Sequence, residues 1–244
     1  MTEADSTKTT KPRKRRKPAP KRGPIRVLLL WVWRGMLAVP AVLVVLVLLF
    51  SFINPPTNLY QMSEDRRLGA LKRDWVDWDE IAPVMARSAV AAEDANFCLH
   101  WGFDMAAIRD AIDAGGNRGA STISQQVVKN VFLWQNRSWL RKAMEAALTP
   151  VVELVWSKQR VLEVYLNVAE FAEGVFGVQA AAQHYFGVDA RDLTDLQAAR
   201  LAAVLPNPKE WDAANPGPQT RRRTGQIISG AETIAADGRA ACFE

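Results

Sequence analysis

An uncharged apolar run near the N-terminus constrains this chain more than any other feature. From Gly35 to Ile53 no charged residue occurs, and residues 27–33 extend the run upstream with only Arg34 between. That length is sufficient for a helix to cross a hydrocarbon core about 30 Å thick. The sequence therefore predicts a single membrane-spanning helix over residues 27–53.

The residues before this run predict its orientation. Residues 1–26 hold ten Lys or Arg against two Asp or Glu, and a basic flank favours the cytoplasmic side of a membrane. The side chains at the end of the run are large where a cleavage site requires small ones, so the helix is expected to persist as an anchor. We therefore expect a cytoplasmic N-terminus, with residues 54–244 on the opposite side.

Charge in the remainder of the chain argues against nucleic-acid binding. The 244 residues include 31 Lys or Arg and 26 Asp or Glu, and the tail's ten and two leave 21 basic against 24 acidic residues. A globular part with this balance lacks the positive field that attracts phosphate backbones. Binding of nucleic acid by the tail alone stays as an alternative. The length allows one large domain plus an appendage.

Helical spacing of apolar residues recurs beyond the anchor, and neither strand-like alternation nor an internal repeat is evident. Asp104 and Ser157 are suitable N-caps, and Ser121 or Thr122 can open another helix. Helices are expected over residues 81–93, 104–115, 121–134, 141–156, 157–168, 178–186 and 195–205. Past Pro206 the helical pattern is weak. The sequence predicts a predominantly α fold.

The two cysteines, Cys98 and Cys242, are too few for a disulfide framework or a metal cluster. Outside the cytoplasm they could pair, but nothing in the sequence requires it. Cys98 lies among apolar neighbours, so we expect it to be a small buried filler.

A carboxylate at the end of an alanine-rich helix is the first candidate for chemistry. Glu93 follows that helix, and Phe97, His100 and Trp101 are expected to pack around it. Apolar surroundings raise the pKa of a carboxylate toward working pH, which suits a proton acceptor. The alternative is that Glu93 or Asp94 only caps a helix or pairs with an arginine.

Two further polar groups favour binding of phosphate. A glycine-flanked turn at 119–122 feeds a helix that carries Gln125, Gln126, Lys129 and Asn130, and amides and a lysine behind a helix N-terminus suit phosphate. A solvated helix face is the alternative for these residues. Farther on, helical spacing places Arg141, Lys142 and Glu145 on one face, where an ordinary surface ion pair is the alternative.

Five motifs occur in order along the chain. E-D-x-x-F-x-x-H-x-G-x-D is matched at Glu93, Asp94, Phe97, His100, Gly102 and Asp104, and G-[AG]-S-T-I-x-Q-Q-x-x-K-N from Gly119 to Asn130. R-K-x-x-E is matched at Arg141, Lys142 and Glu145, K-x-x-[IV]-L-E-x-Y-L-N from Lys158 to Asn167, and G-x-x-x-A-A-x-x-Y-F-G from Gly177 to Gly187. In these motifs, residues 75–210 closely resemble the peptidoglycan glycosyltransferases of glycosyltransferase family 51.

The resemblance implies an all-α, lysozyme-like peptidoglycan glycosyltransferase domain behind a single N-terminal transmembrane helix. The implied substrate is lipid II, a disaccharide-peptide on undecaprenyl pyrophosphate. It would be joined to a lipid-linked growing glycan by a β-1,4 bond, with inversion of the anomeric carbon. The S-x-x-K and K-T-G motifs of a penicillin-binding transpeptidase are absent, so a monofunctional biosynthetic transglycosylase is expected.

By the same resemblance, Glu93 would accept the proton of the acceptor's 4-hydroxyl. Glu145 would be the second catalytic carboxylate and would orient groups near the departing pyrophosphate. The expected substrate-binding residues are Ser121, Gln125, Gln126, Lys129, Asn130, Arg137, Arg141 and Lys142. A divalent cation, Mg²⁺ or Mn²⁺, is a candidate cofactor, although the sequence contains no dedicated set of metal ligands.

The expected organisation is a basic cytoplasmic tail at 1–26, the anchor at 27–53, a linker at 54–74, the glycosyltransferase domain at 75–210 and an extension at 211–244. The expected location is the inner membrane of a bacterium, with the catalytic domain in the periplasm. Expected partners are the two lipid-linked substrates, the membrane and other cell-wall synthesis and division proteins, and no nucleic acid.

The apolar segment 131–134, with Trp139 and Leu140, is hypothesised to dip into the lipid interface, and core packing is its alternative. Two other functions compete with synthesis. A lysozyme-like glycan-cleaving enzyme also uses a carboxylate in a helical fold, but it would not need the pyrophosphate contacts. An inactive scaffold that recruits cell-wall machinery would not need Glu93, Lys129 and Glu145.

Overall fold

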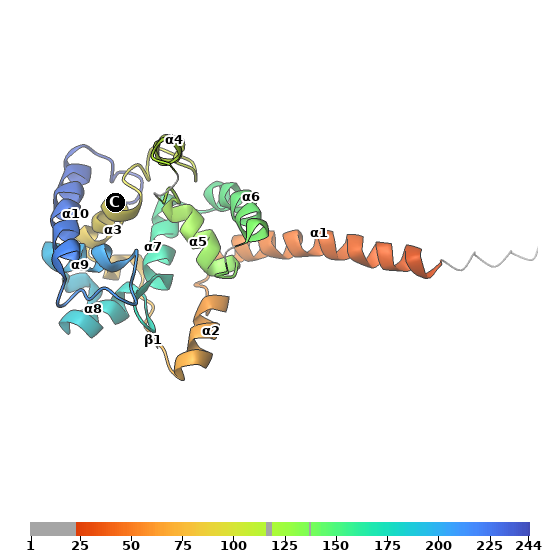
Figure 1. Ribbon diagram of the computed structural model, residues 1–244, viewed down its shortest axis with the longest axis horizontal. Coiled ribbons are helices and arrows are strands. Elements are labelled where there is room, and N and C mark those ends of the chain that lie inside the picture. The colour runs from red at the N-terminus through yellow and green to blue at the C-terminus, as the bar shows by residue number, and fades with distance from the viewer. Residues whose placement is uncertain (1–22, 116–118, 137) are drawn as a thin grey trace, which may run out of the picture. The chain divides into compact units, whose positions relative to one another are not determined.

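The computed structural model describes residues 23–115, 119–136 and 138–244 (Figure 1). The chain divides into two compact units, Met1–Val42 and Leu43–Glu244. Helix α1, Pro24–Phe50, is the element of the first unit, and its last turns belong to the second. Within α1, residues Trp33–Phe50 have a mean hydropathy of 2.3, and the helix is long and apolar enough to cross a membrane by length and composition. Most of the predicted basic tail, residues 1–22, lies outside the described residues.

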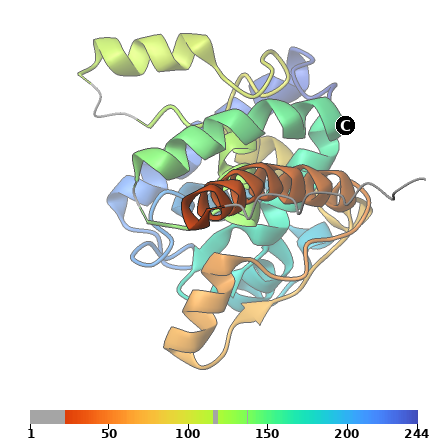
Figure 2. The same cartoon turned by 90° about the vertical axis from the view of Figure 1, so that its right-hand side faces the viewer.

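The second unit is mostly helical, as predicted. Its α-helices are α2 (Leu59–Leu68), α3 (Pro83–Glu93), α4 (Met105–Asp113), α5 (Ile123–Phe132), α6 (Trp139–Val155), α7 (Lys158–Val168), α8 (Val178–Phe186), α9 (Asp195–Val204) and α10 (Pro218–Ala236). Two short 3₁₀ helices are η1 (Trp78–Glu80) and η2 (Ala190–Asp192). In both views α2 and α4 lie at the edges of the unit (Figures 1 and 2).

A small sheet was not predicted. Strands β1 (Lys72–Arg73), β2 (Glu170–Ala172) and β3 (Val175–Phe176) pair in the order β1-β3-β2, with β1 parallel and β2 antiparallel to β3. The expectation of no strands was wrong because strands of two or three residues are too short to show an alternating pattern. The segment 54–74, expected to be a linker, contains α2 and β1.

The helix starts follow the predicted capping chemistry. The side chain of Asp104 accepts hydrogen bonds from the backbone N–H groups of Ala106 and Ala107, and Ser157 caps α7. Of the two candidates for α5, Thr122 is the N-cap, in a reciprocal capping box with Gln125. These contacts satisfy N–H groups that have no partner within a helix.

The weak pattern past Pro206 conceals a long, well-packed helix. The 19 residues of α10 lie against α3 and α9 (Figure 1). Small residues allow this approach, since a Cβ atom built on Gly230 would lie 3.1 Å from the Cβ of Ala91. Small and polar residues give a weak apolar periodicity, which is why the sequence pattern did not predict the length of α10.

The end of α1 is part of the core of the second unit. Val47 is fully buried, and its carbonyl oxygen accepts a hydrogen bond of 2.8 Å from the Trp156 indole N–H. The rings of Phe50 and Trp156 both lie near the ring of Phe132. The guanidinium of Arg160 donates to the carbonyl oxygen of Phe50, an acceptor left free at the helix end.

Two predictions about side chains were wrong. Val131, Phe132 and Leu133 are buried, so this part of the hypothesised lipid-dipping segment packs in the core instead. Cys98 is not a free filler, because it forms a disulfide bond with Cys242. The sequence left that pairing open, since only the fold brings the two cysteines together.

Gly102 is a motif position at which the fold leaves no room for a side chain. Its φ is +83°, and a Cβ atom there would lie 2.7 Å from Thr149 Cγ2. We expect Gly102→Ala to lower the free energy of unfolding by about 2–4 kcal/mol, from backbone strain and the clash together. Gly69→Ala is the matched control, because its φ is +80° and nothing lies within 4 Å, so only strain of about 1 kcal/mol applies. Equal losses in thermal or denaturant unfolding would contradict the clash.

Candidate active site

Glu93 lies at the end of α3 and receives hydrogen bonds from two other helices. Its Oε2 accepts from Gln126 Nε2 of α5 at 3.0 Å, and its Oε1 accepts from Arg223 Nη2 of α10 at 3.2 Å. The side chain is 15% exposed. Burial raises the pKa of Glu93 above the ordinary value, and the contacts with Gln126 and Arg223 oppose that rise. The arrangement suits a proton acceptor.

Arg223 is a site residue that the sequence reading missed. Besides Glu93, its Nη2 donates to the carbonyl oxygen of Ala92 at 3.0 Å, so the guanidinium holds the last turn of α3. The two residues are 130 positions apart, and no local pattern joins them. The only signal in the sequence is the basic run Arg221–Arg223, which does not indicate a partner.

Asp94 connects the loop after α3 to the start of α5. One carboxylate oxygen lies 2.7 Å from His100 Nε2, and the other accepts from the backbone N–H of Ile123 at 2.9 Å. Phe97 is fully buried as expected, but His100 contacts Asp94 and not Glu93, and Trp101 is exposed. The expectation that all three pack around Glu93 was therefore wrong, because the loop turns after Asp94.

The second carboxylate, Glu145 of α6, is buried in a cluster of cations. Its side chain is 3% exposed, and it accepts from Arg141 Nη1 at 3.1 Å and from the ammonium of Lys142. This burial excludes an ordinary surface ion pair. Lys142 Nζ also lies 3.4 Å from the hydroxyl of Ser121, which brings the turn before α5 to the same cluster.

The charges of both carboxylates influence the pKa of Lys129, which lies on α5. Burial lowers its pKa, while the charges of Glu145 and Glu93 act to raise it. Among the described residues, no carboxylate lies within 4.0 Å of its ammonium group. Lys129 therefore keeps hydrogen-bonding capacity for an anion that enters the site.

The other predicted binding residues differ in their surroundings. Gln125 is buried, and its side-chain oxygen accepts from the backbone N–H of Thr122, so its contacts are those of a helix cap. Asn130 accepts a hydrogen bond of 3.1 Å from Gln135. Arg137 lies outside the described residues. The structure thus brings Ser121, Gln126, Lys129, Arg141 and Lys142 together around the two carboxylates, but not Gln125.

Two hollows border these residues. One of about 240 Å³ is lined by Glu93, Asp94, Asp104, Ser121 and Thr122, among others. Another of about 380 Å³ is lined by residues that include Gln126, Lys129, Asn130 and Tyr165. Because Gln126 of the larger hollow donates to Glu93 of the smaller one, the two are adjacent across a hydrogen bond. The site can therefore combine deprotonation of a hydroxyl with stabilisation of an anion.

Metal ligands are not grouped in the part of the chain that the structure describes. No set of three or more His, Cys, Asp or Glu side chains there could hold a metal ion. The carboxylates of Glu93, Asp94 and Glu145 instead bind protein donors. A cation would need most of its oxygen ligands from a bound substrate.

Comparison with known proteins identifies relatives over most of the chain. The family model described as Transglycosylase matches residues 61–232. A biosynthetic peptidoglycan transglycosylase of Jannaschia sp. is 62% identical over 213 residues, which are 87% of this chain and 89% of that protein. Proteins of the same name from Xanthomonas campestris and Pseudomonas aeruginosa are 48% and 46% identical. The first match covers 85% of this chain and 89% of the relative, and the second covers 83% and 92%.

Neutralising the two carboxylates should change stability with opposite signs. Because folding raises the pKa of Glu93, the stability that this group contributes decreases as pH rises from its unfolded pKa through its folded pKa. Glu93→Gln should therefore raise Tm at pH 8, and the gain should vanish near about pH 4, where the unfolded group is protonated. Glu145→Gln should lower Tm at pH 8, since Arg141 and Lys142 lose their shared partner. A lower Tm for both variants would contradict the burial cost at Glu93.

Proposed function

The chain belongs to the transglycosylase family, and we propose that it polymerises lipid II into the β-1,4-linked glycan strands of peptidoglycan. One observation carries the proposal: the buried carboxylate of Glu93 accepts a hydrogen bond from Gln126, which lines a hollow together with Lys129. A base next to a phosphate-binding cluster is what glycosyl transfer from a pyrophosphate requires. A glycan-cleaving enzyme would have no use for the cluster, and a scaffold would have no use for the buried base.

In the proposed reaction, the acceptor's 4-hydroxyl attacks the anomeric carbon of the donor sugar. A new oxygen–carbon bond forms as the bond from that carbon to the pyrophosphate oxygen breaks, and Glu93 takes the hydroxyl proton. Undecaprenyl pyrophosphate leaves with the bonding electrons. A single displacement inverts the anomeric carbon, so no covalent enzyme intermediate is needed.

The cations of α5 and α6 would stabilise the leaving group. Negative charge on the pyrophosphate grows as the bond breaks, and Lys129, Arg141 and Lys142 stand where they can oppose it. Ser121, Gln126 and Asn130 would add neutral hydrogen bonds, and Arg137 is proposed from the family resemblance alone. Glu145 would act as a positioning group, because it holds Arg141 and Lys142 on one side of the cluster.

Arg223 would lower the pKa of the proposed base, Glu93. Burial favours the protonated form of Glu93, which cannot accept a proton, and the nearby guanidinium lowers the pKa again. A divalent cation, Mg²⁺ or Mn²⁺, stays a proposal. It would be held mainly by pyrophosphate oxygens, because the described residues offer no group of ligands of their own.

We place the catalytic unit in the periplasm, with α1 as an inner-membrane anchor and the N-terminus in the cytoplasm. The Cys98–Cys242 disulfide supports this location, since such bonds persist in oxidising compartments. Both proposed substrates are membrane lipids, so an anchored enzyme meets them at the bilayer surface. Contacts with other cell-wall synthesis and division proteins are proposed from the family alone.

The outer face of α6 is the proposed contact with lipid, in place of the buried segment 131–133. Trp139 is 92% exposed, Leu140 66% and Leu154 74%. Large apolar side chains exposed together along one helix suit the interface of a bilayer. The face belongs to the helix that carries Arg141, Lys142 and Glu145, so lipid contact would keep the pyrophosphate cluster close to the membrane.

Polymerisation of purified lipid II by the full-length protein in detergent tests the function directly. The wild type should produce lysozyme-sensitive glycan strands. Glu93→Gln should lower kcat by about 10²–10⁴-fold, because it removes the proton acceptor and keeps the shape. Cleavage of preformed glycan with no polymer would support a hydrolase. Binding of lipid II without either reaction would support a scaffold.

The pH dependence of kcat tests the role of Arg223. Only ionised Glu93 accepts a proton, so kcat should fall as pH drops through its raised pKa. Arg223→Gln removes a charge that lowers this pKa, and the acid limb should therefore move to higher pH. Arg222→Gln, an exposed neighbour on α10, is the matched control and should leave the limb in place. Equal profiles for Arg223→Gln and wild type would contradict this role.

Fluorescence quenching in proteoliposomes tests the lipid-facing surface. Trp139→Cys, labelled with an environment-sensitive dye under non-reducing conditions, should be quenched by lipids that carry a quencher. Leu196→Cys on α9 is the control, since Leu196 is also exposed but lies on another helix. Similar weak quenching at both positions would rule out lipid contact by α6.

A further inference from the structure

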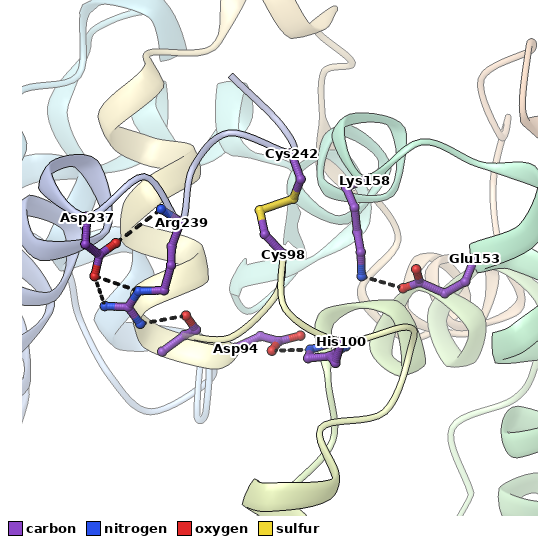
Figure 3. The surroundings of a disulfide bond; sticks show 9 residues. Asp94, Cys98, His100, Glu153, Lys158, Asp237, Arg239 and Cys242 are labelled. Atoms are coloured by element: carbon purple, nitrogen blue, oxygen red, sulfur yellow. Dashed lines mark hydrogen bonds and ion pairs between the residues drawn. A yellow bond between two sulfur atoms is a disulfide. The ribbon is translucent and has the colours of Figure 1, made fainter.

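The disulfide bond joins two segments that are far apart in the sequence. Cys98 lies in the loop that follows α3, and Cys242 lies after α10, 144 positions later, with 5.6 Å between their Cα atoms. The relatives' names and the proposed reaction assign no role to this bond. Figure 3 shows it beside Asp94 and His100, in the loop that continues directly from Glu93.

Two further contacts fasten the same two segments. Arg239 Nη1 donates to the carbonyl oxygen of Ala95 at 3.0 Å (Figure 3). The buried ring of Phe243 packs against the ring of Phe97 in the loop, and also against the ring of Trp78 in η1. We call residues 237–244 the C-terminal lock.

Another contact of the C-terminal lock reaches α3 itself. Arg87 Nη1, on that helix, lies 2.5 Å from the side-chain carboxylate of Glu244. The C-terminal lock therefore touches the helix that ends at Glu93 as well as the loop that leaves it. Of its contacts the disulfide is the only covalent one, so it is the contact that a change of redox conditions can open.

Both segments that the C-terminal lock fastens lead to the candidate base. The loop 94–101 follows Glu93 and holds α5 through the contact of Asp94 with Ile123. The C-terminal lock continues α10, which carries Arg223 to Glu93.

We propose that the C-terminal lock, closed by the Cys98–Cys242 disulfide, positions Arg223 and the 94–101 loop around Glu93, so that full activity depends on oxidation of this pair. The inference rests on the proposed function. The residues of the lock are positioning residues, because they act through Arg223 and Asp94 and not on a substrate.

Closure of the lock is a thiol–disulfide exchange. The two thiols lose two protons and two electrons as the sulfur–sulfur bond forms, and a protein or small-molecule disulfide takes up the electrons and becomes two thiols. Such oxidants act outside the cytoplasm. A chain still in the cytoplasm would therefore carry an open lock, and the lock would close after export.

The pKa of Glu93 should depend on the state of the C-terminal lock, because several charged and polar groups lie near its carboxylate. Asp94 follows it on the chain, Gln126 and Lys129 face it from α5, Tyr165 from α7 and Arg223 from α10. Only Arg223 among them is carried by the helix that leads to the lock. Release of α10 should weaken that one favourable charge and leave the groups of α5 and α7 in place.

Hydrogen exchange of the full-length protein tests the lock without any assay of activity. Reduction should speed exchange of the amides in the 94–101 loop, whose hydrogen bonds include Phe97 N–H to Asp94 and Leu99 N–H to Asn96. Amides of α7 serve as the internal control and should keep their rates. The chain has two cysteines, so dithiothreitol has a single target, and Cys98→Ser/Cys242→Ser should behave like the reduced wild type. Unchanged exchange in the loop would overturn the proposal.

The pH profile of lipid II polymerisation separates positioning from a loss of fold. At a temperature well below the Tm of the reduced protein, opening the lock should move the acid limb of kcat up by about half a pH unit, a threefold loss of rate on that limb. A merely structural role would scale kcat at every pH and leave the limb in place. Adding dithiothreitol to the double serine variant should change nothing.

Combination with Arg223→Gln provides the sharpest control. If the lock acts through Arg223, removing both cysteines in that variant should add no further shift of the limb. Additive shifts, or a limb that never moves, would overturn the mechanism. Failure of the oxidised wild type to polymerise lipid II would refute the proposed function instead, and hydrogen exchange would still decide whether the lock orders the loop.

Discussion

The position of the Glu93 carboxylate depends on three helices at once, and the packing of the catalytic unit keeps these helices together. Glu93 ends α3, receives the amide of Gln126 from α5, and receives the guanidinium of Arg223 from α10. A carboxylate removed from water needs such partners, because burial alone favours its protonated form. Packing of α9 against α3 and α10 keeps two of these helices together. Asp94 fastens the third by accepting the first N–H of α5.

Two carboxylates in one site have different surroundings, and this separates their roles. Glu145 is paired on both oxygens with cations of its own helix. Glu93 has one amide and one guanidinium shared with a backbone carbonyl, so its charged form is less well supported. The better-paired group organises cations for a leaving anion. The less well-paired group is the one suited to take a proton.

Much of the site could be predicted from sequence, because its parts are local. Glu145, Arg141 and Lys142 share a face through helical spacing alone, and a cap of α5 at Ser121 or Thr122 follows from residue type. Other expectations failed where they required knowledge of a path through space. His100 contacts Asp94 because the loop bends there, and the side chain of Gln125 belongs to the capping box of α5. The three strands are only two or three residues long, which is too short to show an alternating pattern in the sequence.

The sequence by itself determined the apolar helix α1, the order and limits of most helices, and the residue types for acid–base chemistry and phosphate binding. Each of these depends on residues within about one or two helical turns. Only the tertiary structure decided that Arg223 reaches Glu93 across 130 positions and that Cys98 meets Cys242 across 144. It also decided that segment 131–133 is core while Trp139 is exposed. Those outcomes depend on which helix faces pack together, and packing is a property of the whole fold that no local pattern records.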